Sequence, residues 1–186
     1  MRMLLLTCSL LAACARGDID PLVGAVREGD AATTESLIAQ GADPNRPSGV
    51  NGWPPLMHAV HKNQLAAAET LLEHGADVNR TDPNGVSALM MAAGYGNNAM
   101  VGLLLRHHAD VLARDRGGDT ALDYALGGMS DIDSFTLLRC QDSTVALLIR
   151  SDSRLRGTAH RTARTLAALK RCASDIYTTR KTTFPK

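Results

Sequence analysis

A five-residue pattern returns along this chain at a nearly fixed distance. It reads GADPN at residues 41–45, GADVN at 75–79 and HADVL at 108–112, so its copies begin 34 and then 33 residues apart. Apolar residues recur at the same spacing: Leu56 and Ala59, Leu89 and Ala92, Leu122 and Ala125. A period of about 33 residues predicts a chain built from one repeated unit. A single unit cannot bury its apolar face, so we expect a stacked solenoid that offers a contact surface and no closed catalytic cavity.

Residues at the ends of each period predict two helices joined by a tight corner. Asp20 can cap the first helix of the first period, with Pro21 at its first position. Gly75 can end the second helix of the second period, because glycine tolerates the positive φ found there. In the fourth period, Thr120 and Asp123 have the spacing of a capping box. These signals predict an all-α chain.

The period, the helix starts and the Gly-Ala-Asp turn together resemble the ankyrin repeat, whose signature is T-P-L-H-x-A followed by G-A-D-V-N. The resemblance implies an all-α solenoid of about four helix-turn-helix repeats over residues 18–156. The repeats would cover 18–50, 51–83, 84–116 and 117–156, with an insertion at 127–142. A helix at 157–177 would cap the stack, followed by a basic tail at 178–186. The signature histidine is replaced throughout, by Val23, Met57, Met90 and Asp123.

The first fourteen residues predict export. Arg2 precedes an apolar stretch that, as a helix, would rise only about 16 Å and so would not span a membrane. This pattern is typical of a signal peptide at 1–13. Leu11-Ala12-Ala13-Cys14 resembles the lipobox of bacterial lipoproteins, which implies that Cys14 becomes an acylated N-terminus, and Ala15 behind it favours the outer membrane. The alternative is a plain signal peptide cut near Ala13 or Ala15, which would leave a soluble periplasmic protein.

The charge of the chain is nearly balanced but unevenly distributed. Its 186 residues carry a net charge of +1, which disfavours a protein that grips the phosphate backbone of nucleic acid. Residues 1–149 hold 10 basic and 17 acidic residues, whereas 150–186 hold 10 basic and two acidic ones. Either the basic end packs on the acidic repeats, or part of this charge faces anionic lipid or an acidic partner. We expect a monomer without a cofactor.

The four cysteines leave one question open. Cys8 lies in the leader and Cys14 in the lipobox. In an exported chain Cys140 and Cys172 can form a disulfide, which would close a loop of about 30 residues and contribute roughly 3–4 kcal/mol. Two thiols are the alternative. The sequence has no CxxC, HExxH, P-loop or Ser-His-Asp pattern, so we expect neither a metal site nor an enzyme.

The resemblance also implies where a partner would bind. In ankyrin domains partners dock on the concave face, which is made of loop tips and the exposed side of each first helix. Carried over by position, the partner-binding candidates are Arg27, Glu28, Val50, Asn51, Trp53, His61, Lys62, Asn84, Val86, Tyr95, Arg116 and Asp119. Trp53, the only tryptophan, is predicted to project from a turn as an exposed hot spot; the alternative is packing over Pro54-Pro55. Tyr95 is predicted on the solvent side of its helix.

Several functions remain compatible with these features. The first is a lipid-anchored envelope protein that binds another protein, as an adaptor or protector of an envelope enzyme. The second is an immunity protein that neutralises a toxin directed to the periplasm. The third is a secreted effector aimed at a host. An enzyme would need a cluster of titratable groups in the insertion of the fourth repeat.

Overall fold

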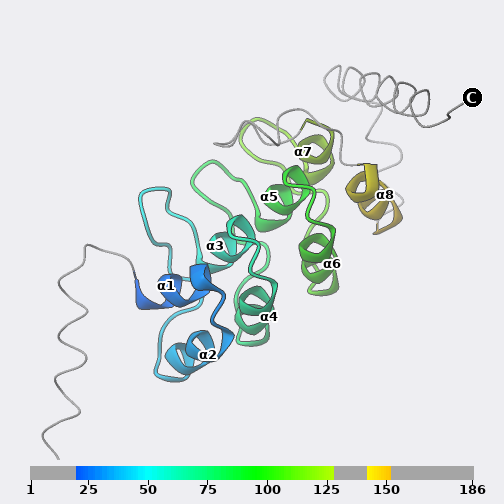
Figure 1. Cartoon of the computed structure of the whole chain (residues 1–186). Coiled ribbons are helices and arrows are strands. Elements are labelled where there is room, and N and C mark those ends of the chain that lie inside the picture. Colours follow the sequence, from blue (N-terminus) through cyan, green and yellow to red (C-terminus); the bar gives the residue numbers. More distant parts are fainter. Residues whose placement is uncertain (1–19, 128–141, 152–186) are drawn as a thin grey trace, which may run out of the picture.

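The computed structural model describes residues 20–127 and 142–151, and the helices in this part of the chain form four consecutive pairs. The pairs are α1 (Pro21–Glu28) with α2 (Ala31–Ala39), α3 (Pro55–His61) with α4 (Leu65–Glu73), α5 (Ala88–Gly94) with α6 (Asn98–Arg106), and α7 (Ala121–Gly127) with α8 (Asp142–Ser151). Each pair packs on the next (Figure 1), so that α1, α3, α5 and α7 form one layer and the remaining four helices another. The predicted all-α solenoid is confirmed.

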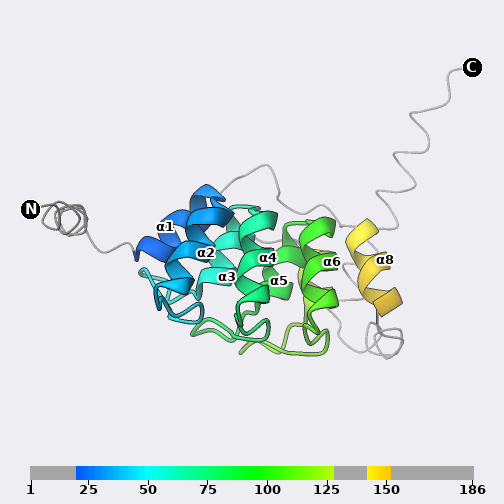
Figure 2. The ribbon, with the colours of Figure 1, turned by 90° about the horizontal axis from the view of Figure 1, so that it is seen from below.

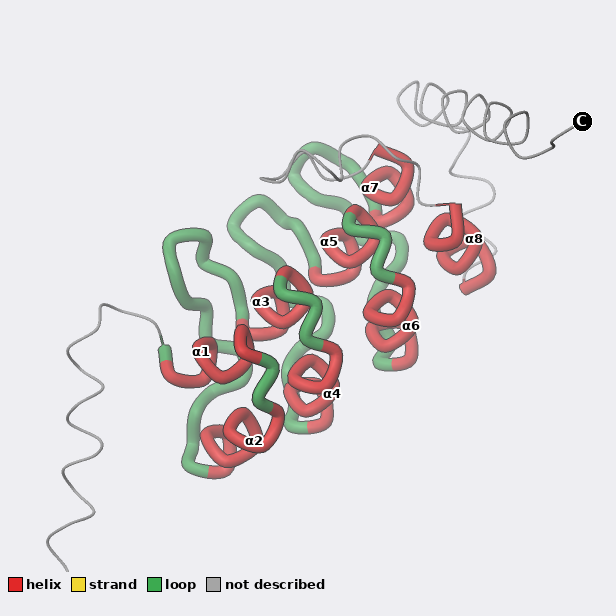
Figure 3. The backbone as a smooth tube through the Cα atoms, in the orientation of Figure 1, coloured by secondary structure: helices red, strands yellow, loops and turns green. Residues whose placement is uncertain are grey.

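The loops that join one pair to the next lie together on one side of the stack. They cover residues 40–54, 74–87 and 107–120 and are called the finger loops below (Figure 3). Figure 2 shows the helix pairs following one another in a row above these loops. Neighbouring loops touch: the backbone N–H of Arg116 donates to the carbonyl oxygen of Asn84 at 2.9 Å. The finger loops therefore form a continuous row beside the layer of α1, α3, α5 and α7.

Side-chain caps start the helices where the sequence predicts them. Asp20 Oδ1 accepts a hydrogen bond from the N–H of Leu22 at 3.0 Å. At α7, the backbone N–H and the hydroxyl of Thr120 donate to Asp123 Oδ2 at 2.9 and 2.7 Å, and the predicted capping box is confirmed. Such a cap satisfies donors that the helix leaves without partners and contributes about 1 kcal/mol.

Asparagine side chains tie the Gly-Ala-Asp turns of successive repeats together. Asn45 Nδ2 donates to the carbonyl oxygen of Gly75 at 3.0 Å, and Asn45 Oδ1 accepts from the N–H of Asp77 at 2.7 Å. Asn79 makes the same two contacts to the turn at 108–112. Gly75 itself has a φ of +86°, the left-handed conformation predicted for the end of α4. The pattern that reveals the repeat in the sequence is thus also a contact between repeats.

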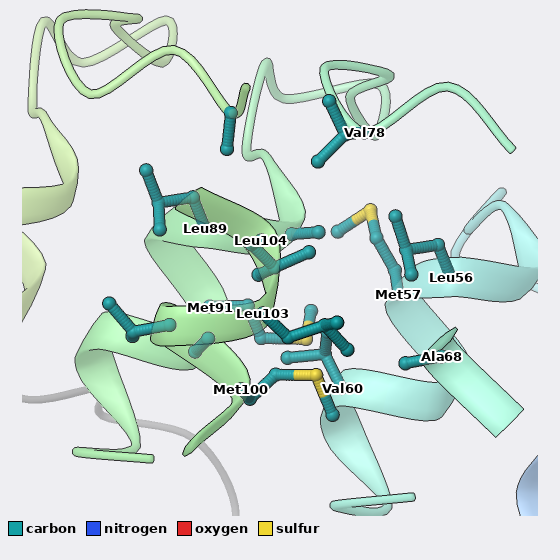
Figure 4. Close-up of a cluster of buried hydrophobic side chains, with 14 of the residues drawn as sticks. Leu56, Met57, Val60, Ala68, Val78, Leu89, Met91, Met100, Leu103 and Leu104 are labelled. Atoms are coloured by element: carbon teal, nitrogen blue, oxygen red, sulfur yellow. The ribbon is translucent and has the colours of Figure 1, made fainter. Parts of the chain in front are cut away.

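The core fills the space between the two helix layers. Figure 4 shows its part in the second and third repeats, with Leu56, Met57, Val60, Ala68, Val78, Leu89, Met91, Met100, Leu103 and Leu104. Met57 and Met90, which replace the signature histidine, are 0% and 1% exposed. The flexible apolar side chain of methionine fills these positions and adds to the core.

Several predicted features lie outside the described residues. They are the leader at 1–13 with Cys14, most of the insertion at 127–142, Cys140 and Cys172, the capping helix at 157–177 and the tail at 178–186. Among the helices that are described, none combines the length and the apolar character needed to cross a membrane.

Candidate partner-binding site

The predicted partner-binding residues lie at the ends of the first helices and in the finger loops. Arg27 and Glu28 end α1, His61 ends α3 with Lys62 as its C-cap, and Tyr95 is the C-cap of α5. The finger loops carry Val50, Asn51, Trp53, Asn84, Val86, Arg116 and Asp119. We call the surface formed by these helix ends and loops the loop face. Its exposed members are Arg27, Glu28, Val50, Asn51, Lys62, Asn84 and Arg116, and its half-buried members are His61, Val86, Tyr95 and Asp119.

Trp53 does not project from its loop, so the prediction of an exposed hot spot is wrong. Its side chain is only 9% exposed. The indole meets the rings of His58 and His61 edge-on, with centroid distances of 5.5 and 5.3 Å. The N–H of Ser48 donates to the carbonyl oxygen of Trp53 at 2.9 Å, which folds the loop back toward α3. Burying a large apolar ring is favourable, so Trp53 forms a wall of the loop face.

His61 and Tyr95 join the second repeat to the third at this face. His61 Nδ1 lies 2.8 Å from the hydroxyl oxygen of Tyr95, and the two ring centroids are 6.0 Å apart. Tyr95 directly follows the last residue of α5 and is half-buried, so it lies at the end of the helix and remains partly exposed while it packs against the edge of the core. Trp53, His58, His61 and Tyr95 form a single aromatic cluster across two repeats.

His58 belongs to the aromatic cluster although the sequence reasoning did not select it. Its Nε2 lies 3.4 Å from the carbonyl oxygen of Ser48. Burial lowers the pKa of His58 below its ordinary value of 6.5, and the charges of Arg27 and His61 lower it further, while the contact with Ser48 raises it. The signal in the sequence is the spacing: His58 and His61 are three residues apart on one helix, so both can lie under one indole.

Tyr124 is a second residue that the sequence reasoning missed. Its hydroxyl donates to Asp115 Oδ2 at 2.8 Å. Burial raises the pKa of Tyr124 above its ordinary value, and the hydrogen bond to Asp115 and the charges of Asp115, Asp119 and Asp82 raise it further. Tyr124 is the fourth residue of α7, as His58 is of α3. Equivalent positions in two repeats therefore have neighbouring charges of opposite sign: positive near His58 and negative near Tyr124.

The loop face presents chemistry suited to contact. Charged and amide side chains surround a packed aromatic cluster, a combination common at protein interfaces. In the described residues no three His, Cys, Asp or Glu side chains are placed to hold a metal ion together. Every buried polar side-chain atom in the same part of the chain has a hydrogen-bond partner.

Comparison with known families agrees with this architecture. Residues 4–82 match a family description of ankyrin repeats in three copies, and residues 71–125 match one of ankyrin repeats in many copies. No curated protein matches the chain. Ankyrin repeats indicate binding to another protein and are in general modules without catalytic activity. The two overlapping matches together span residues 4–125 and coincide with the period and the paired helices, so this chain contains ankyrin repeats.

Proposed function

We propose that the protein binds another protein through its loop face. The observation that carries this proposal is the His61–Tyr95 pair, which joins two repeats by a hydrogen bond of 2.8 Å and keeps both rings at the surface. Side chains that are already ordered lose little conformational entropy when a partner docks. The exposed Arg27, Glu28 and Lys62 at the neighbouring helix ends would supply the polar rim.

The charges of the loop face favour a partner whose surface carries the opposite charge at each end. Arg27 acts on His58 at the α1–α3 end, whereas Asp82, Asp115 and Asp119 act on Tyr124 near α7. A partner with acidic side chains opposite the first two repeats and basic ones opposite the fourth would be attracted in one orientation. Complementary charge of this kind raises the association rate and excludes wrong partners.

The leader extends the proposal to the cell envelope. Leu11-Ala12-Ala13-Cys14 supports a lipoprotein that is anchored through acylated Cys14, on the periplasmic side of the outer membrane. Several acyl chains would give durable anchoring, because each buried CH₂ contributes about 0.8 kcal/mol. In this location the protein would act as a monomeric adaptor or protector of an envelope enzyme. The second candidate, an immunity protein against a periplasm-directed toxin, would use the same face with much tighter binding.

Partner capture with charge-reversed variants tests the binding face. The tagged full chain would be cross-linked in an envelope extract as wild type, as Arg27→Glu/Lys62→Glu and as Glu69→Lys/Glu73→Lys. The third form is a matched control, because Glu69 and Glu73 are exposed on α4 in the other helix layer. We expect proteins that are captured by the wild type and the control and lost with Arg27→Glu/Lys62→Glu. The same proteins captured by all three forms would contradict the proposal.

The anchor needs a separate experiment. Wild type and Cys14→Ala would be expressed with radiolabelled palmitate, and the cells would then be fractionated. We expect label and membrane association in the wild type only. If the wild type is unlabelled and fractionates like Cys14→Ala, the lipid anchor is rejected. The remaining interpretations are then a plain signal peptide or a secreted effector. The affinity of a captured partner separates the remaining roles, because an immunity protein should bind its toxin at about nanomolar Kd or tighter.

A further inference from the structure

The only tryptophan of the chain lies against two histidines in the wall of the loop face. His58 and His61 are one helical turn apart on α3, and the ring of each meets the indole of Trp53 at an interplanar angle of 60°. Histidine is the side chain whose charge ordinarily changes near neutral pH. The indole of Trp53 is therefore in direct contact with two side chains whose protonation depends on pH.

The two histidines differ in how their hydrogen bonds respond to a second proton. The hydroxyl of Tyr95 can donate or accept, so its 2.8 Å bond to His61 Nδ1 persists in reversed direction when that nitrogen is protonated. His58 Nε2 faces the carbonyl oxygen of Ser48, which only accepts. A neutral His58 with its hydrogen on Nε2 already satisfies this contact. A second proton leaves this contact in place and adds a positive charge to a half-buried ring.

The charged groups around His58 come from every element packed on α3. The charged groups are Arg27 and Glu28 on α1, His61 (when protonated) and Lys62 at the end of α3, and Glu69 and Glu73 on α4; Tyr95 at the end of α5 is titratable but neutral in this pH range. Arg27 acts on His58 with a charge of the same sign as that of a protonated imidazole. Glu28, Glu69 and Glu73 are exposed, so water and salt screen their charges. The surroundings thus disfavour a second proton on His58.

We propose that His58 makes binding at the loop face sensitive to pH: the neutral imidazole holds Trp53 in the wall, and protonation of His58 releases Trp53 with its loop and weakens partner binding. This inference rests on the proposed function of the same face. Because burial lowers the pKa of His58 below 6.5, the packed arrangement is complete above pH 6.5. It is lost as the pH falls through the pKa that His58 has in the folded protein.

A titration of the full chain tests the switch without any partner. Fluorescence excited selectively in tryptophan reports on Trp53 alone, and NMR of the histidine rings follows His58 directly. We expect one fluorescence transition below pH 6.5 that coincides with the titration of His58, is absent in His58→Gln and persists in His61→Gln. Circular dichroism would show that the helices remain intact throughout.

Two results of this titration would overturn the proposal. One is a His58 pKa at or above 6.5 in the wild type, which would mean that attraction between a charged imidazole and the indole outweighs the cost of burial. The other is a fluorescence transition that persists in His58→Gln. The NMR measurement on the wild type decides the first point even if His58→Gln fails to fold.

Binding measurements separate this inference from the proposed function. For a partner captured at the loop face, we expect an affinity that weakens as the pH is lowered below 6.5, in step with the titration of His58 followed by NMR, and no such change in His58→Gln. An affinity independent of pH would overturn the regulation and leave the binding function intact. The absence of any partner at neutral pH would overturn the binding function, while the titration of Trp53 would still report on His58.

Discussion

Asn79 Oδ1 accepts a hydrogen bond from the backbone N–H of Asp110 at 2.8 Å, although the two residues are 31 positions apart. Asn45 holds the turn of the second repeat in the same way. The next residue in this series is Leu112, whose side chain has no amide to continue it. The side-chain connection between turns therefore joins the first three repeats and ends where asparagine becomes leucine.

The turn contacts predict a measurable loss of stability. Asn79→Leu removes the hydrogen bonds to His108 and Asp110 at once. Each hydrogen bond contributes about 0.5–1.5 kcal/mol, so we expect the free energy of unfolding to fall by about 1–2 kcal/mol in urea denaturation. The matched control is Asn51→Leu at an exposed loop tip, where we expect a change within about 0.5 kcal/mol. Equal effects of the two substitutions would contradict the role of the turn contacts.

Met90, which replaces the signature histidine in the third repeat, lies in the core, so shortening its side chain should destabilise the fold. Met90 is 1% exposed, so Met90→Ala removes packed atoms and leaves a cavity. We expect a loss of about 2–5 kcal/mol, measured by urea or thermal unfolding. Leu65 on α4 is 39% exposed, and Leu65→Ala should cost well under half as much. A Met90→Ala variant as stable as Leu65→Ala would show that this position is not part of the core.

Asp30 caps α2, and we expect its contribution to the free energy of unfolding to be lost in acid. The hydroxyl and the N–H of Thr33 donate to Asp30 and lower its pKa below the ordinary 3.8. The ionised cap therefore stabilises the fold above pH 3.8, and this contribution is lost as the pH falls through the pKa of Asp30 in the folded protein. We expect the stability difference between wild type and Asp30→Ala to be full at neutral pH and to shrink as the pH falls below 3.8. A difference that stays constant over this range would refute the role of the charge.

Tyr124 should contribute stability with the opposite pH dependence, so that its contribution is lost at alkaline pH. Burial, the hydrogen bond to Asp115 and the nearby carboxylates raise the pKa of Tyr124 above 10. The neutral phenol therefore contributes stability below pH 10, which is lost as the pH rises through the raised pKa. We expect Tyr124→Phe to be less stable than wild type by about 0.5–1.5 kcal/mol at neutral pH, with a gap that narrows above pH about 10. Parallel stability curves for the two proteins would contradict this expectation.

The helices and their caps could be predicted because their signals are local. Thr120 and Asp123 are three residues apart, and the contact between them needs only one turn of helix. The loop between repeats is different. Whether Trp53 projects or packs depends on the hairpin closed by Ser48 and on the two histidines that α3 places beneath the indole. Local spacing does not reveal such a contact, so the sequence leaves both an exposed and a packed Trp53 open.

The repeat follows from the sequence alone, because units with a period of about 33 residues and recurring caps and turns can bury their apolar faces only by stacking. The sequence also marks the helix ends and loops that form the loop face. Which of these side chains are exposed there depends on contacts between repeats in the folded chain. His61 and Tyr95 meet across 34 positions of sequence, and His58 enters the site because Trp53 covers it. Contacts between repeats set the burial, the local charge and the hydrogen bonds of each residue, and these are properties of neighbours that the chain order does not place side by side.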